Sequence, residues 1–531
     1  MGPFDGGGAA VTGDIFLQGG RMPGHEGAFD VLMADGRIRA IVPSGIVSTP
    51  ARSRVLALDG RFFVPGLWDN HVHFTQWAAQ GRRHDFSSST SSAADVLSRV
   101  ASIVGSGADT GAGTGAGVGA GGVPSVPGGA TQAPLIGFGL RDGLWDSTLD
   151  RFGLDAVAGG RQVILISGDL HCCWLNSAAL AHFGFDGHPT GLLREDDCFQ
   201  VTGLVNDLSA EAGDELAAEA ARVAASRGVV GIVDLEMADN LAVWRRRIGA
   251  GQRDLRVAAG IYATHLDQAI EARLRTGDIM PKTGGLLSVG PFKVVTDGSL
   301  NTRTAYCYDE YPGLEGQEGS RGMLTVAPDD LLALLERATA AGLVPAVHAI
   351  GDHANALALG VFEHLGTGGR IEHAQLVADA DFSRFAASGV TASVQPEHAM
   401  DDRDVADHFW VGRTDRAFAL ASLRASGAAL LLGSDAPVAP LDPWVTMAAA
   451  VGRSRDQRPP WHPEQRIAAV DALAASANGT AIIGVGMPAD LVVTDLDPLF
   501  CDPDELRRMP VSATFLAGRP TYLAPWAAAL A

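Results

Sequence analysis

The chain has 531 residues, of which 47% are hydrophobic and 19% charged, the composition of an ordinary globular protein. Its formal charge of −21 argues against nucleic acid and anionic membrane surfaces as partners, since both require basic patches. The length exceeds that of one typical core, so we expect one large domain and at least one smaller unit.

The first residues lack a basic segment followed by an apolar run, so no signal peptide is predicted. No window of about 20 residues is continuously apolar, which argues against a membrane span. The five cysteines are odd in number and unpatterned, as in proteins of reducing compartments rather than disulfide frameworks. We therefore expect a cytoplasmic protein.

Both ends of the chain contain short β-rich runs broken by Gly and Asp-Gly turns, at 13–62 and 487–523. Such runs are typical of antiparallel hairpins. We predict a small composite β-sandwich domain built from residues 1–63 and 485–531.

Between the ends, β-branched runs alternate with Ala/Leu-rich helical stretches, which indicates a parallel α/β architecture. If residues of about 74–228 form one large insertion after the first strand, eight strands remain in 64–484, the number in a (β/α)8 TIM barrel. Within the insertion, the Gly/Ala-rich stretch of about 105–130 is predicted to be a flexible surface loop without chemistry. The ten predicted strands, two of them inside the insertion, are 68–73, 134–140, 162–168, 229–235, 255–262, 290–296, 343–348, 370–373, 389–395 and 429–434.

The stretch VPGLWDNHVHF at 64–74 ends the first barrel strand with two histidines, His71 and His73. Positions i and i+2 of a strand point to the same face, so both imidazoles converge on one point. Two converging imidazoles are half of a metal site.

Four further barrel strands carry chemically suitable groups at their ends, where the catalytic groups of such barrels lie. Taken singly, each has an ordinary interpretation: a strand histidine can pack in the core, and an Asp can cap a helix. A Lys in an apolar run is either paired or chemically modified, because burying an ammonium is costly. Their joint placement predicts a metal site, with Lys293 in strand four, His348 in strand five, His373 in strand six and Asp435 after strand eight.

Several motifs resemble those of the amidohydrolase superfamily: VPGLWDNHVHF, GPFKVVTDGSLNTRTA, VHAIGDHAN, IEHAQ and GSDAPVAPLDP. More narrowly they are similar to its YtcJ-like branch, amidohydrolase family 3, which includes N-substituted formamide deformylases. GDLHCCWLNSAAL at 168–180 and PADLVVTDLDP at 488–498 extend the resemblance over almost the whole chain.

The resemblance implies a ligand set and a modified lysine. His71, His73 and Asp435 would bind one divalent ion, and His348 and His373 a second. Lys293 would be carboxylated by CO₂, and its carbamate would bridge two ions. Zinc is expected because N and O ligands with open positions suit it, while Mn, Co, Ni or Fe stay open.

The implied activity is metal-dependent hydrolysis of a carbon–nitrogen bond in a small molecule, an amide or an N-formyl or N-acyl amine rather than a peptide. A water on such ions has its pKa lowered to about 7 and becomes hydroxide. Asp435 is the candidate general base, unless it serves only as a ligand.

The other predicted site residues lie on loops of the same barrel face or beside the ligands. The candidate substrate contacts are His171, Arg303 and His398. Asp352 and Glu372 are candidates to orient ligand histidines, and Asp69 to position the strand end. The apolar run CCWLNSAALAHFGF suggests a hydrophobic N-substituent.

Two alternatives remain. Superfamily deaminases of heterocyclic amines bind one metal, usually lack the strand-four Lys and carry a Glu soon after the strand-five histidine; here Lys293 is present and Ala-Ile-Gly-Asp follows His348. A catalytically silent barrel acting as a binding protein would normally have lost ligands, and all six positions are occupied. A homodimer is the state common among such barrels.

Overall fold

The computed structural model describes residues 13–46, 48, 53–87, 91–106, 133–206 and 208–530. Its centre is a sheet of eight strands, all paired in parallel, which confirms the predicted barrel. The barrel strands in chain order are β6 (Leu67–Val72), β12 (Val229–Asp234), β13 (Arg256–Tyr262), β14 (Leu287–Val295), β15 (Pro345–Ala349), β16 (Gly369–His373), β17 (Val390–Val394) and β18 (Leu430–Leu432).

Helices cover the outer face of this sheet and the strands' own side chains fill its interior, so the strands are buried on both faces and are nearly continuous apolar runs. All six residues of β12 and all five of β15, for example, are buried. The main barrel helices are α6 (Ala210–Ser226), α7 (Asn240–Gly249), α8 (Leu266–Glu271), α9 (Pro328–Ala340), α10 (Asp352–Leu365), α11 (Phe382–Ala387), α12 (Pro396–Phe409), α13 (Leu420–Ala425), α14 (Pro443–Gly452), α15 (Ala469–Ala475) and α16 (Pro503–Arg507).

The sheet closes between its first strand and the segment that follows its last. The side chain of Asn70 donates to Leu432 O at 2.9 Å, and Asp435 N donates to His71 O at 2.8 Å. A parallel bridge between Val72 and Ala436 extends the contact. Closure thus places the end of β6 directly beside Asp435.

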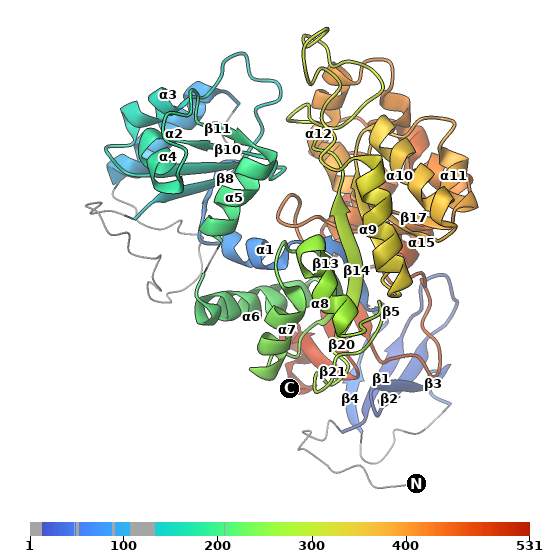
Figure 1. Cartoon of the computed structure of the whole chain (residues 1–531). Helices are drawn as coiled ribbons and strands as arrows, with labels where there is room; N and C mark the ends of the chain where they lie inside the picture. Colours follow the sequence, from blue (N-terminus) through green and yellow to red (C-terminus); the bar gives the residue numbers. More distant parts are fainter. Residues whose placement is uncertain are drawn as a thin grey trace.

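Most of the chain between β6 and β12 forms a separate lobe beside the barrel (Figure 1). Its five-stranded sheet has the order β11-β10-β9-β8-β7, and β8 and β9 are the two strands predicted inside the insertion. The elements are β7 (His84–Asp85), α2 (Ala93–Ser106), β8 (Leu135–Leu140), α3 (Arg151–Val157), β9 (Val163–Ser167), β10 (Cys172–Leu175), α4 (Ser177–Phe183), β11 (Leu192–Arg194) and α5 (Glu195–Val205).

The lobe is narrower than the predicted insertion of 74–228, because α1 (Phe74–Gln80) and α6 pack against each other and α6 packs on β12. Residues 105 and 106, at the start of the loop predicted at about 105–130, end helix α2. The rest of that stretch lies outside the described residues.

The two ends of the chain pair with each other at one side of the barrel (Figure 1). Strand β5 (Phe62–Pro65) pairs antiparallel with β19 (Leu491–Thr494), and residues of both ends share one apolar core. The exact domain boundaries stay a prediction. The two four-stranded sheets are β3-β2-β1-β4, with β1 (Ile15–Gly20), β2 (Phe29–Ala34), β3 (Arg37–Pro43) and β4 (Arg54–Ala57), and β21-β20-β19-β5, with β20 (Val511–Leu516) and β21 (Arg519–Leu523).

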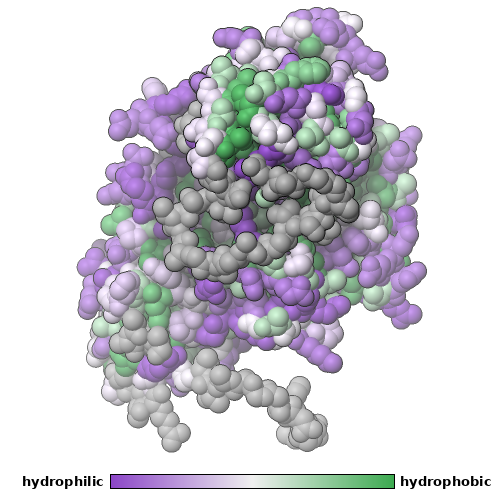
Figure 2. All heavy atoms as spheres, turned by 90° about the vertical axis from the view of Figure 1, so that its left-hand side faces the viewer, coloured by the Kyte–Doolittle hydropathy of each residue, from purple (hydrophilic) through white to green (hydrophobic). Residues whose placement is uncertain are grey.

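Hydrophilic residues cover much of the visible surface on the lobe side of the molecule, as expected for a strongly charged chain, with a smaller hydrophobic patch on the upper part (Figure 2). Among the described helices, none combines the length and apolar character needed to cross a membrane.

Candidate metal centre

The six predicted ligands line one pocket at the carboxyl ends of the barrel strands. The pocket is open, with an empty volume of about 530 Å³. Its position follows from the parallel sheet, because the carboxyl ends of all strands meet at one mouth. The ligands brought together are His71, His73, Lys293, His348, His373 and Asp435.

Three of these residues form a tight inner cluster. His71, His373 and Asp435 each offer one ligand atom, and these atoms all lie within 4.8 Å of one another. Asp435 Oδ1 lies 3.4 Å from His71 Nε2 and 3.3 Å from His73 Nε2. One carboxylate oxygen therefore faces both histidines of the first strand.

Glu372 fixes the orientation of His71. The His71 Nδ1–H donates to Glu372 Oε2 at 2.7 Å, and Arg370 Nε donates to Glu372 Oε1 at 2.5 Å. Burial alone would raise the pKa of Glu372, but Arg370 and His71 hold it well below its usual range. The resulting anion leaves His71 Nε2 free to face Asp435, as in carboxylate–histidine–metal arrangements.

The other histidines have partners that the sequence reasoning missed. His373 Nδ1 donates to Gln395 Oε1 at 2.8 Å, and His348 Nε2 lies 3.4 Å from Asp297 Oδ1. Gln395 directly follows β17 and Asp297 follows β14. The position of a polar residue just after a barrel strand, the rule that identified the ligands, would have identified both.

Two cluster residues have strained backbones. His373 has a φ of 75° and Asp435 a φ of 58°, in the left-handed region that non-glycine residues rarely adopt. Each costs about 1–3 kcal/mol and persists only where surrounding contacts enforce it. These two backbone conformations lower the stability of the fold, and they direct the side chains of His373 and Asp435 into the barrel mouth.

His71 and His373 are suited to bind as neutral imidazoles, the form that ligates metals, whereas burial of His73 is outweighed by Asp435, which raises the pKa of His73. Burial lowers the pKa of His71 to about 4. Burial and the neighbouring His348 and His71 lower the pKa of His373 well below its ordinary value. Burial would raise the pKa of Asp435, but His71 and His73 hold it well below its usual range, so this side chain is an anion.

Lys293 is buried, and its Nζ has no hydrogen-bond partner among the described residues. Burial lowers its pKa to about 8, although Glu372 and Asp435 oppose the shift. The lowered pKa increases the share of neutral amine, the form that can react with CO₂.

The other two residues expected to position neighbouring groups, Asp69 and Asp352, occupy different surroundings. Asp69 Oδ1 accepts from His71 N at 3.2 Å and Ser434 N at 2.9 Å, and so ties the end of β6 to the segment after β18. Burial raises the pKa of Asp69 to about 7. Asp352 accepts from Arg416 Nη1 and Tyr308 N, both at 2.9 Å; no hydrogen bond or ion pair joins Asp352 to the ligand histidines in the described part of the chain.

The three residues predicted to contact substrate lie at different distances from the pocket. His171, from the lobe, lines the pocket; burial would lower its pKa, but Glu195 and Asp169 raise it to about 9. His398 is buried beside the cluster, with Nε2 3.8 Å from Asp435 Oδ2. Arg303 is not among the pocket-lining residues, and its guanidinium lies over Phe409 instead.

The apolar run that suggested a hydrophobic N-substituent packs inside the lobe. Cys173, Leu175 and Leu180 belong to one buried cluster of the lobe and Trp174 to another. Alternation along β10 sends these side chains to the two faces of the lobe's own sheet. The apolar side chains that line the pocket are Leu170, Phe199, Met237, Val295 and Val438.

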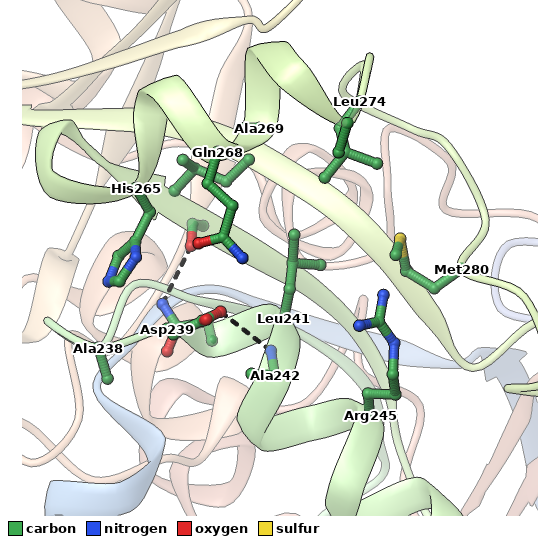
Figure 3. A pocket seen from close by; sticks show the side chains of 14 residues that line it. Ala238, Asp239, Leu241, Ala242, Arg245, His265, Gln268, Ala269, Leu274 and Met280 are labelled. Atoms are coloured by element: carbon green, nitrogen blue, oxygen red, sulfur yellow. Dashed lines mark hydrogen bonds between the residues drawn. The ribbon is translucent and has the colours of Figure 1, made fainter.

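A second pocket, of about 600 Å³, lies between α7 and α8 (Figure 3). Its floor is apolar, with Leu241, Leu274 and Met280, and Arg245 and His265 lie at its edges. Although larger, it contains no group of converging metal ligands among the described residues. We therefore place the chemistry in the pocket at the barrel mouth.

Fold and site together define a (β/α)8 barrel with a candidate metal centre at the carboxyl ends of its strands. Residues 54–522 match the amidohydrolase family, so the chain belongs to that family and thereby to the hydrolases. The resemblance inferred from the motifs is thus confirmed.

Similar proteins agree with this assignment. Putative amidohydrolase YtcJ of Bacillus subtilis is 25% identical over 88% of this chain and 90% of its own. The N-substituted formamide deformylase of Arthrobacter pascens is 25% identical over 92% of this chain and 94% of its own. A crystal structure of an uncharacterized metal-dependent hydrolase from Pyrococcus horikoshii has the same fold, with a TM-score of 0.72 at 22% identity, over 92% of this chain and 99% of that one.

Proposed function

We propose that this protein is a metal-dependent hydrolase that cleaves a carbon–nitrogen bond outside peptides, in an amide or an N-formyl or N-acyl amine. The observation that carries the proposal is the convergence of His71, His373 and Asp435 within 4.8 Å in a pocket at the barrel mouth. Similarity to an N-substituted formamide deformylase supports the bond type.

The residues present fit divalent ions. Among the described residues, Lys293 Nζ is a buried ligand atom without a hydrogen-bond partner, and leaving such an atom unsatisfied costs about 1–3 kcal/mol. Neutral imidazoles and a carboxylate are the donors that zinc prefers. His71, His73 and Asp435 would hold one ion, His348 and His373 a second.

Carboxylation of Lys293 would complete the charge balance. The neutral amine nitrogen forms a bond to the carbon of CO₂, the electron pair of one C=O π bond moves to oxygen, and the nitrogen loses one proton, which converts the neutral amine into a carbamate anion. Native mass spectrometry of the zinc-loaded protein should show the added mass of one CO₂, absent from Lys293→Met. An unmodified Lys293 in protein with two bound ions would contradict the carboxylation.

Asp435 is the proposed acid–base group. Bound ions would supply a water of lowered pKa and polarise the substrate carbonyl. As an anion facing both His71 and His73, Asp435 takes the proton of the attacking water and delivers it to the departing nitrogen. His171, a cation on the lobe side of the pocket, is the proposed donor to the carbonyl oxygen.

The pocket lining supports a substrate with an apolar substituent. Leu170, Phe199 and Met237 line its lobe side and rim, and Met237 is 44% exposed. A small molecule gains affinity mainly by burying apolar surface against such groups, while a few polar groups orient it.

A substrate panel tests the proposal. Zinc-loaded protein is given N-formyl amines, N-acyl amines, simple amides and aminopurines, and the release of amine, carboxylate and ammonia is followed. Amine and carboxylate from the first two classes are expected. Ammonia from aminopurines alone would favour the deaminase alternative, and no turnover at full metal occupancy would contradict hydrolysis.

A further inference from the structure

Within the lobe, Glu195 holds His171 by both ring and backbone. Glu195 Oε2 accepts from His171 Nδ1 at 2.8 Å, and Glu195 N donates to His171 O at 2.9 Å. The Glu195 side chain is 5% exposed. Because Nδ1 is engaged, Nε2 is the ring atom available to the pocket that His171 lines.

The barrel loop after β14 reaches the same carboxylate. Thr304 Oγ1 donates to Glu195 Oε1 at 2.6 Å. A parallel contact lies beside it, where Ser299 Oγ donates to Asp169 Oδ2 at 2.7 Å. Ser299 N also donates to Thr304 Oγ1 at 3.0 Å, which joins the two contacts. We name these four residues, Asp169 and Glu195 of the lobe and Ser299 and Thr304 of the barrel, the hydroxyl–carboxylate latch.

Close packing and backbone strain accompany the latch. A Cβ at Gly298 would lie 2.5 Å from Glu195 Oε1 and would also overlap Thr304 Oγ1. Only glycine at this position therefore lets the loop after β14 approach Glu195 of the lobe. Leu170 and Glu195 have φ values of 68° and 47°. Strain of this kind in non-glycine residues is concentrated at functional sites.

The latch ends at the candidate metal centre. The ring centroids of His171 and His348 are 5.7 Å apart, and Asp169 and Leu170 line the pocket with His171. The lobe therefore contributes one wall and one donor to a site whose ligands all come from the barrel.

We propose that Glu195 and Thr304 are positioning residues, which hold His171 so that its Nε2–H donates to the oxygen of the substrate carbonyl. The role of His171 rests on the proposed function. Thr304 acts through Glu195, and Glu195 through His171, without touching substrate. The latch thereby makes docking of the lobe a requirement for turnover.

Kinetics of matched variants test the proposal. Thr304→Val keeps the shape of the side chain but loses the hydroxyl, whereas Thr304→Ser keeps the hydroxyl. With unchanged zinc content, kcat should fall about 10- to 100-fold in Thr304→Val, since small displacements of catalytic groups cost this much. KM should change less, and Thr304→Ser should stay near wild type.

A double-mutant cycle separates positioning from general destabilisation. If Thr304 acts through His171, the Thr304→Val loss should disappear in a His171→Ala background, because residues in one network are not additive. A loss of equal size in both backgrounds would overturn the proposal.

Hydrogen exchange supplies a readout without catalysis. In metal-free protein, the amides of residues 168–175 should exchange faster in Thr304→Val than in wild type or Thr304→Ser. Unchanged exchange in Thr304→Val would overturn the latch even if the enzyme turns over. Faster exchange in a protein that hydrolyses no substrate would keep the latch and reject the proposed function instead.

Discussion

Glu372→Gln is expected to weaken metal binding by reversing the tautomer of His71. Arg370 only donates, so the glutamine must present its oxygen to Arg370 and its NH₂ group to His71 Nδ1. His71 Nδ1 must then accept, and the ring proton moves to Nε2. That nitrogen is the one facing Asp435, 3.4 Å away, and a protonated nitrogen cannot bind a metal.

The expected loss of metal affinity follows from the role of the Glu372 carboxylate, which orients His71. Removing a carboxylate that orients a ligand histidine costs about 10- to 100-fold in metal affinity, which is about 1.4–2.7 kcal/mol. Arg370 keeps Asn70 O at 2.5 Å and Ser393 Oγ at 2.8 Å, so the metal-free fold should survive. Glu372→Ala should be more destabilising, by about 3–5 kcal/mol, because it breaks a buried ion pair and leaves Arg370 without this partner.

Zinc affinity is measured by competition with a chromophoric chelator, and stability by calorimetry of the metal-free protein. Glu363→Gln is the matched control: it breaks the partly exposed pair with Arg384, worth about 0–1 kcal/mol, and should leave zinc affinity unchanged. Wild-type zinc affinity in Glu372→Gln would refute the tautomer argument.

Three further predictions concern catalysis, pH and metal. Asp435→Asn should keep the fold and much of the metal yet lose about 10²- to 10⁴-fold in kcat; near wild-type turnover would remove the base assignment. In metal-free protein, the raised pKa of His171 stabilises the fold fully below its ordinary value of 6.5, and this contribution is lost as pH rises through about 9. In urea titrations, the fall in the free energy of unfolding with rising pH should be smaller in His171→Asn than in wild type. Parallel pH profiles of the two proteins would contradict this role of His171. A chelator should lower Tm, since ligand at about 1,000 times Kd stabilises by about 4 kcal/mol; an unchanged Tm in calorimetry after complete metal removal would count against the site.

The barrel was predictable because its strands are covered on both faces. Each strand is a short apolar run between helical stretches, and β14, for instance, overlaps the predicted strand at 290–296. The ligands were predictable because a parallel sheet places the carboxyl end of every strand at one mouth. A residue at the end of a predicted strand is therefore expected at that mouth.

The groups that orient the ligands were harder to predict, because their contacts cross the barrel. Glu372 is adjacent to His373 in sequence but binds His71 of the first strand. The left-handed backbone of His373, with a φ of 75°, departs from strand alternation, so that both neighbouring side chains reach the interior of the barrel. The apolar run 172–185, which suggested a hydrophobic N-substituent, packs inside the lobe, because an apolar run indicates burial but not which core buries it.

The site has two parts, the metal ligands of the barrel and His171 of the lobe. The contacts that orient the ligands join strands that are not neighbours. Glu372 of β16 holds His71 of β6, and these strands are separated in the sheet by β17 and β18. The ligand geometry is therefore a property of the closed barrel, whereas His171 depends on docking of the lobe. Substitutions in the lobe should accordingly change turnover and substrate preference at constant metal content, while Glu372→Gln should change metal content first.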